Sequence, residues 1–145
     1  MAAFEMPVEI RWADLDPNFH LRHTVYYDWA AMCRLRFLDQ NGLTPAFMRQ
    51  WSFGPILFRE EAVFRKEIKF GDHIMINLEL VKARKDYSRW TIQHTVVKNG
   101  DIVSAVITVD GAWLDTAKRK LTTPPQEVVA TFSHMPTSEN FQWLD

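Results

Sequence analysis

The sequence predicts an α+β domain in which one buried helix lies on the concave face of an antiparallel sheet. The first observation is a run of helical periodicity near the N-terminus, where apolar residues recur on one face. The second is a set of later segments in which apolar and polar residues alternate with a period of two. The third is an Asn-Gly pair between two such segments, which is typical of a tight hairpin. The 145 residues are enough for one hydrophobic core, and we expect residues 1–145 to form a single domain.

The N-terminal part is predicted to hold a strand at residues 5–12, a loop, and then the buried helix. The loop is residues 13–23, ADLDPNFHLRH. After it, apolar positions recur at i, i+3, i+4, i+7 and i+11, namely Tyr26, Trp29, Ala30, Cys33 and Phe37. Thr24 is a candidate N-cap, and Asn41-Gly42 is a helix stop signal. Because other faces of this helix are also apolar, we expect it to be largely buried.

The middle of the chain is predicted to pass from an irregular segment into strands. Residues 43–55 contain two prolines and a glycine, with a short helical turn near residues 46–51. Residues 56–70 hold one or two extended runs. After the turn signal Gly71-Asp72, residues 74–80 alternate apolar and polar positions and therefore predict a half-buried strand.

The last third is predicted to begin with a hairpin of long strands. Residues 89–96 alternate, and Asn99-Gly100 then turns the chain into a strand over residues 102–114. Gly111, inside that strand, indicates a bulge or a close approach of another group to the backbone.

The C-terminal segment is predicted to add a short helix over residues 123–132 and an irregular tail after Pro136. The sheet would then leave its outer face and at least one edge to be covered. We therefore expect the protein to form oligomers.

Composition and charge exclude several classes of protein. The formal net charge is −1, so no basic field favours nucleic acid or an anionic membrane. The single cysteine, Cys33, cannot form an internal disulfide, which suits a reducing compartment. No apolar run approaches the roughly 20 residues that cross a bilayer, and the N-terminus lacks the features of a signal peptide. We expect a cytoplasmic protein with no nucleic-acid partner and no membrane span.

The loop at residues 13–23 gathers several titratable side chains directly before the helix. Asp14 and Asp16 lie two residues apart, and His20 and His23 follow three residues apart. Aspartates in loops often satisfy local backbone donors, and two carboxylates with H-x-x-H also resemble a set of metal ligands. A third interpretation is catalytic, because a carboxylate opposite a helix N-terminus can act on a carbonyl whose oxyanion the free N–H groups stabilise. The residues alone leave these interpretations open.

The stretch RWADLDPNFHLRHTVYYDWAAMCRLRFL resembles the opening of the 4-hydroxybenzoyl-CoA thioesterase family, whose members have the hotdog fold. The family pattern D-x-D-x-x-G-H-x-x-(N/H)-x-x-Y is matched by Asp14, Asp16, His20, His23 and Tyr26. The later stretch FRKEIKFGDHIMINLEL resembles the family's segment around a Gly-Asp turn, so the resemblance covers about residues 5–130. Phe19 departs from the pattern, because many relatives have a glycine there. It predicts an altered loop or a narrower acyl pocket.

The resemblance implies an acyl-CoA thioesterase that releases a carboxylic acid and CoA. It assigns Asp16 as the catalytic carboxylate, acting as nucleophile or general base, and leaves Asp14 a structural role. The amides near His23 and Thr24 are predicted to form the oxyanion hole, and His23 is predicted to orient the water or the carboxylate. We expect no metal and no separate cofactor, since CoA is part of the substrate. Candidates for the acyl pocket or for the core are Trp51, Phe53, Phe58 and Trp90.

Coenzyme A carries phosphates, which require cationic contacts. Arg84, Lys85 and Arg89 lie around a predicted turn and are candidates for contacts to those phosphates; a solvated turn is the alternative. The resemblance also implies a homodimer or homotetramer in which two sheets join edge to edge. Phe19 and Arg22 depart from the usual loop and motivate an alternative function, a non-catalytic hotdog module that binds acyl-CoA or an acyl-carrier protein.

Overall fold

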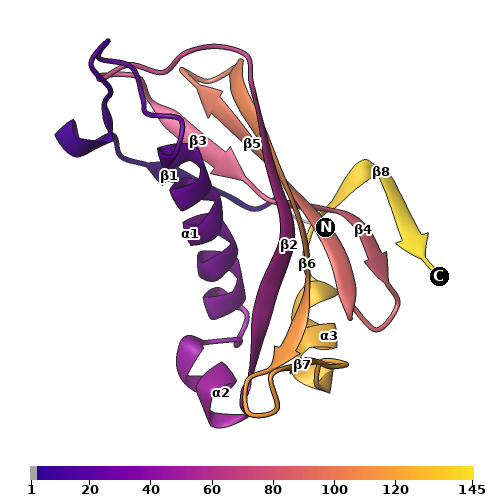
Figure 1. The fold of residues 1–145 in the computed structure, drawn as a ribbon. Helices are drawn as coiled ribbons and strands as arrows, with labels where there is room; N and C mark the ends of the chain where they lie inside the picture. The colour runs from indigo at the N-terminus through magenta and orange to yellow at the C-terminus, as the bar shows by residue number, and fades with distance from the viewer. Residues whose placement is uncertain (1–2) are drawn as a thin grey trace.

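The computed structural model describes residues 3–145, and its main feature is one curved sheet with a long helix lying along it (Figure 1). In chain order the elements are β1 (Glu5–Val8), the 3-10 turn η1 (Trp12–Asp14), α1 (Val25–Gln40), α2 (Pro45–Gln50), β2 (Phe53–Phe64), β3 (Ile74–Asn77), β4 (Glu79–Arg84), β5 (Arg89–Lys98), β6 (Ile102–Asp115), β7 (Lys120–Leu121), α3 (Gln126–Phe132) and β8 (Thr137–Leu144).

The centre of the sheet is the antiparallel pair β5 and β6. β2 pairs with the other side of β6 and has no second partner strand within residues 3–145, so it is an edge of the sheet. On its far side β5 pairs with β3 near one end and with β4 near the other. β1 extends the sheet beyond β3, and β8 extends it beyond β4 in the parallel direction.

The predicted alternation of the central strands is confirmed. The buried positions of β5 are Trp90, Ile92, His94 and Val96. At the end of that strand, Asn99 and Gly100 have φ of 54° and 95°. Two consecutive residues with positive φ are the backbone of the tight hairpin turn that Asn-Gly predicts.

α1 packs on the sheet through one apolar face, as its periodicity predicts. The buried residues are Val25, Tyr26, Trp29, Ala30, Cys33, Phe37 and Leu38. Gly42 has φ 94°, and the N–H of Leu43 donates to the carbonyl of Leu38 at 2.9 Å, which is a glycine-dependent helix end. Met32 and Leu35 on another face are 45% and 39% exposed, so the expected burial holds for one side of the helix only.

Two predictions about the strands are corrected by the structure, and a third is narrowed. Of the one or two extended runs expected over residues 56–70, the structure has one, β2, which ends at Phe64; the irregular connection after it buries Ile68 completely. The alternating segment after it is divided at Leu78 into β3 and β4. The tail after Pro136 is not irregular but forms β8. Its pairing with β4 is a long-range contact, which local periodicity does not reveal.

Candidate active site

The loop before α1 folds back on itself as a narrow hairpin. The N–H of Asp16 donates to the carbonyl of His20 at 2.8 Å, and the N–H of Arg22 donates to the carbonyl of Asp14 at 2.7 Å. The N–H of Leu21 then bonds to the connection that follows β2. These bonds fix the two aspartates relative to the start of α1.

Phe19 occupies the turn of this hairpin with a left-handed backbone, at φ 64°. Its N–H donates to the carbonyl of Asp16 at 2.9 Å and closes a turn in which glycine is the usual residue at this position. The loop therefore keeps the shape that a glycine would give it. The Phe19 side chain is 63% exposed and lies beside Trp12, with 6.4 Å between ring centroids. Phe19 is not part of the lining of the Asp16 cavity, and its effect on an acyl pocket stays a prediction.

Asp14 is a buried carboxylate with a structural partner. Its side chain is 1% exposed, and its Oδ1 lies 2.7 Å from Nη2 of Arg11. The backbone N–H of Arg11 also donates to Oδ2 at 2.9 Å. The hydrogen bond from the Arg11 side chain is the main cause that lowers the pKa of Asp14 below its usual range. Asp14 therefore stabilises the turn η1 as an ionised carboxylate.

Asp16 has a different environment, because it is half-buried and lines a cavity of about 310 Å³. Its Oδ1 accepts the N–H of Asn18 at 2.9 Å and the N–H of His20 at 3.1 Å. Within residues 3–145 no hydrogen-bond donor reaches its Oδ2. The cavity lining consists of Asp16, Leu21, His23, Tyr26, Phe64, Arg65, Lys66 and Glu67. Two of the predicted site residues, Asp16 and His23, therefore face one cavity.

The third predicted site residue, Thr24, lies at the N-cap position of α1 but does not cap the helix with its side chain. Its Oγ1 instead accepts a hydrogen bond from Nη1 of Arg22 at 2.9 Å, while Nε of Arg22 donates to the carbonyl of Ala13 at 3.2 Å. Arg22 thus ties the loop to the helix start, a role that the sequence did not reveal. Among the described residues, no acceptor takes the N–H groups of His23 and Thr24, so both are available to a ligand.

Sequence reasoning missed the contribution of the end of β2 to this cavity. The ring of Phe64 packs edge-on against Tyr26, with 5.0 Å between centroids, and burial raises the pKa of Tyr26 to about 12. Arg65 and Lys66 follow directly and bring two cations to the cavity beside Asp16. They lie about fifty residues from Asp16 in sequence, and only the tertiary fold brings them together.

The sequence also matches a known protein family. Residues 10–132 match the sequence profile of the thioesterase-like superfamily. The chain belongs to this superfamily. No curated protein shows a significant match to the sequence.

Solved structures show the fold of this superfamily member to be the hotdog fold. A hypothetical protein from Staphylococcus aureus, solved in complex with CoA, is 18% identical, with a TM-score of 0.87 over 94% of this chain and 88% of that chain. A 1,4-dihydroxy-2-naphthoyl-CoA thioesterase from Synechocystis is 15% identical, with a TM-score of 0.81 over 92% and 97% of the two chains. A thioesterase from Thermus thermophilus, complexed with coenzyme A and Zn, is 21% identical, with a TM-score of 0.72 over 88% and 89%.

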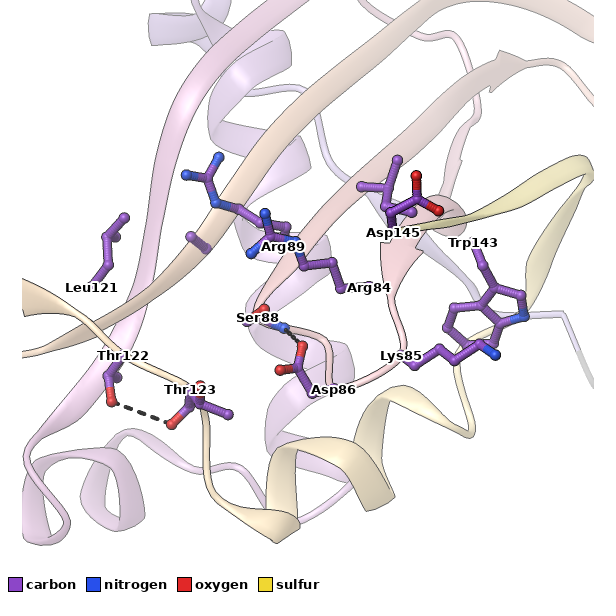
Figure 2. Close-up of a pocket in the computed structure, with 12 residues that line it drawn as sticks. Arg84, Lys85, Asp86, Ser88, Arg89, Leu121, Thr122, Thr123, Trp143 and Asp145 are labelled. Carbon is purple, nitrogen blue, oxygen red and sulfur yellow. Dashed lines mark hydrogen bonds between the residues drawn. The ribbon is translucent and has the colours of Figure 1, made fainter.

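The predicted phosphate contacts of this thioesterase-like chain lie at the other end of the sheet. Arg84, Lys85 and Arg89 line a separate cavity of about 950 Å³ between the β4–β5 turn, β7 and the C-terminus. In Figure 2, Arg84 and Arg89 extend over the same part of this cavity, while Lys85 lies beside Trp143. Asp86 and Asp145 also line it, so the cluster is not purely cationic.

The separation between the two cavities follows from the strand register. Arg89 pairs with Ala112 of β6, whereas Phe64, which lines the Asp16 cavity, pairs with Ala105 of the same strand. This stretch of β6 corresponds to roughly 23 Å. One subunit of the thioesterase-like protein therefore does not bring Asp16 and Arg89 into one compact site.

Glu67 also lines the Asp16 cavity, whereas His20 is not part of its lining. The ring of His20 lies 3.4 Å from the carboxylate of Glu67 at its edge. Burial raises the pKa of Cys33 to about 12, so this cysteine is a core thiol. Within residues 3–145, no three His, Cys, Asp or Glu side chains are grouped to hold a metal ion. No helix in that range is long and apolar enough to cross a membrane.

Proposed function

We propose that this protein is an acyl-CoA thioester hydrolase whose catalytic carboxylate is Asp16. The observation that carries the proposal is the cavity that Asp16 shares with His23, at a helix start where the N–H groups of His23 and Thr24 have no acceptor among the described residues. Membership of the thioesterase-like superfamily gives independent support. A carbonyl in this cavity would meet a carboxylate on one side and positively polarised N–H groups on the other.

In the reaction that we propose, a water molecule attacks the thioester carbonyl carbon and Asp16 takes its proton. The carbonyl oxygen becomes an oxyanion, which accepts hydrogen bonds from the N–H groups of His23 and Thr24. The C–S bond then breaks, and the CoA thiolate leaves and takes up a proton. The products are a carboxylic acid and CoA. Direct attack by Asp16 would instead form a mixed anhydride, which water hydrolyses to the same products.

The hydrogen bonds of Asp16 suit this role. Oδ1 is held by the N–H groups of Asn18 and His20, so the turn fixes the direction of the carboxylate. Oδ2 is left to accept a proton from water or to attack the carbonyl. His23 is exposed at the cavity, where its ring can orient the water.

We further propose that the working unit is a homodimer or homotetramer. β2 is a long edge strand with unpaired backbone groups, and it exposes Leu57, Phe58, Val63 and Phe64. Pairing of two β2 strands would cover this edge and place the Arg84, Lys85 and Arg89 cluster of one subunit closer to the Asp16 cavity of its neighbour. The cluster would then contact the phosphates of CoA across the interface. Arg65 and Lys66 offer further cations within the same subunit.

The deciding experiment offers the purified protein a panel of acyl-CoA esters while free thiol is followed. We expect thiol release by the wild type and its loss in Asp16→Asn, a variant that keeps an oxygen to accept the N–H groups of Asn18 and His20. Release by no ester of the panel, or equal release by wild type and variant, would contradict the hydrolase.

The alternative function is a non-catalytic module that binds acyl-CoA or an acyl-carrier protein. Thermal unfolding with a non-hydrolysable acyl-CoA analogue distinguishes the two. Stabilisation by the analogue without turnover of any ester would support the binding module, and stabilisation with turnover would support the hydrolase.

A further inference from the structure

A third cavity, of about 250 Å³, lies between α1 and the concave face of the sheet. Most of its lining is apolar, including Leu38, Met48, Trp90, Trp113 and Phe132. It opens between α1 and the edge strand β2, where Leu35 and Leu57 are about 40% exposed. One charged side chain, Arg34 of α1, reaches into this apolar surrounding.

The Arg34 side chain is nearly buried, and no carboxylate forms a hydrogen bond with its guanidinium among the described residues. Its side chain is 13% exposed, and burial lowers its pKa. Nη1 donates to Nε2 of His94 at 3.0 Å, and the other ring nitrogen of His94 donates to the carbonyl of Asn77 at 2.8 Å. This assignment makes His94 neutral, in agreement with burial lowering its pKa to about 3. The carboxylate of Glu60 lies 4.0 Å from Nη2, too far for a hydrogen bond.

The cavity therefore holds more hydrogen-bond donors than the protein satisfies. Arg34 has five N–H donors, and within residues 3–145 the only hydrogen-bond acceptor found for them is the ring of His94. Nε1 of Trp90, another residue of the cavity lining, is buried without any acceptor in the same range. The other Arg34 nitrogens are not among the buried unpaired atoms, so they are open to water or to a ligand. A ligand that brings an oxygen acceptor into this apolar surrounding can pair with them.

The cavity beside Asp16 and the apolar cavity with Arg34 share no lining residue, and on β2 a small residue lies between them. On β2, Phe64 and Glu60 share the concave face with Ala62 between them, since strand residues alternate between faces. Phe64 lines the Asp16 cavity, and Glu60 is the neighbour of Arg34. On α1, Ala31 lines the apolar cavity together with Arg34. The four residue steps along β2 from Glu60 to Phe64 span about 13 Å, which an extended chain of about ten single bonds covers.

We propose that the acyl chain runs between α1 and β2 from the Asp16 cavity into the apolar cavity, a course that we call the groove, and that Arg34 binds a neutral oxygen near the far end of that chain. This rests on the proposed function, because the thioester must lie beside Asp16. The fitting acyl group is about ten bonds long and ends in a hydroxyl or carbonyl oxygen. A neutral oxygen is favoured over a carboxylate, because Glu60 already places a negative charge beside Arg34.

The catalytic test compares kcat/KM for ω-hydroxydecanoyl-CoA, decanoyl-CoA and hexanoyl-CoA. We expect the wild type to prefer the hydroxylated chain over decanoyl-CoA by about tenfold, the size of one hydrogen bond to a charged group. Arg34→Met should remove this preference and leave hexanoyl-CoA turnover in place. Glu60→Gln should raise the turnover of the ω-carboxylate analogue. Equal rates with decanoyl- and ω-hydroxydecanoyl-CoA in the wild type would overturn the proposal.

A second variant covers the case in which Arg34→Met fails to fold. Ala62→Leu adds volume at a half-buried position of β2 on the concave face, and Val106→Leu on the outer face of the neighbouring strand β6 is its control. We expect Ala62→Leu to lower kcat/KM at least tenfold for the ten-carbon esters but not for hexanoyl-CoA, and Val106→Leu to change neither. If Ala62→Leu alters the oligomeric state and leaves chain-length preference unchanged, the groove is a subunit contact and the proposal is wrong.

Binding without turnover separates this proposal from the proposed hydrolase. Thermal unfolding of the wild type with ω-hydroxydecanoic acid should show a larger shift than with decanoic acid, and Ala62→Leu should lose that difference. If the unfolding temperatures shift in this way while no ester is hydrolysed, the proposed hydrolase activity is wrong and the proposed acyl-chain groove is supported. If esters are hydrolysed but neither shifts nor rates depend on the terminal oxygen, the hydrolase stands and the groove proposal fails.

Discussion

Asp14 and Asp16 are two residues apart, yet the fold gives them opposite environments. Asp14 is buried and both of its oxygens contact Arg11. Asp16 is half-buried, has one oxygen held by the turn, and faces a cavity with the other free of protein donors in the described residues. Identical side chains in one hairpin therefore differ in what they can do. The partner and the cavity, rather than the residue type, separate a structural carboxylate from a candidate catalyst.

The largest effect that we expect is on turnover. Asp16→Asn should reduce kcat by about 10³-fold, because the amide can neither accept the proton from water nor attack the carbonyl. Asp14→Asn should keep the kcat of its folded fraction within about threefold, since Asp14 has no contact with the cavity. Thiol release normalised to folded protein measures both. Similar losses in the two variants would remove the distinction between the aspartates.

Stability should show the reverse order. Asp14→Asn weakens the ionic hydrogen bonds to Arg11, and we expect the free energy of unfolding to fall by about 1–2 kcal/mol. The lower end of this range applies if the exposure of the Arg11 side chain, 69%, screens the pair. The free energy of unfolding of Asp16→Asn should lie within about 0.5 kcal/mol of the wild-type value. Urea unfolding at neutral pH checks this, and a more stable Asp14→Asn protein would refute the structural role.

The pH dependence sharpens the same comparison. The pKa of Asp14 is lower in the folded protein than in the unfolded chain, so its contribution to stability is present above about pH 4. It is lost as the pH falls through the folded value, because the unfolded chain takes up the proton first. The stability difference between wild type and Asp14→Asn should therefore shrink below about pH 4. His94 is common to both proteins and cancels in the difference, which urea unfolding at pH 7, 4.5 and 3 measures.

The smallest effect concerns the turn that links the two environments. Phe19→Gly relieves a left-handed backbone at an exposed position and should stabilise the protein by about 0.5–1 kcal/mol. Phe70→Gly is the matched control, because Phe70 is also exposed, at 70%, and has no positive φ. Phe70→Gly should leave the temperature of thermal unfolding unchanged or lower it. Equal shifts for the two variants would mean that the backbone at Phe19 stores no strain.

Much of the fold was predictable where one local pattern determined one local structure. The alternation around His94 and the Asn99-Gly100 turn are confirmed, and so is the close approach at Gly111. β8 was missed because its pairing with β4 is parallel and long-range, and the break at Leu78 was missed because the burial pattern continues through it.

The candidate site divides in the same way. The motif places Asp16 and His23 in one short loop, and the structure has both at one cavity. Arg65 and Lys66 come to that cavity from the end of β2, which no local signal in the sequence indicates. The basic cluster around Arg89 lies in another cavity, and whether it meets the substrate is still a prediction that depends on a second subunit.

Gly111 lies directly across from Trp90 in the sheet, on the face of the apolar cavity. A Cβ there would lie 2.2–2.6 Å from the Trp90 ring, so any side chain at this position must displace that ring. Trp90 also lines the apolar cavity under α1. A single methyl group at position 111 would therefore change the shape of that cavity through the Trp90 ring. Substitution at this glycine should therefore change which ligands the apolar cavity accepts.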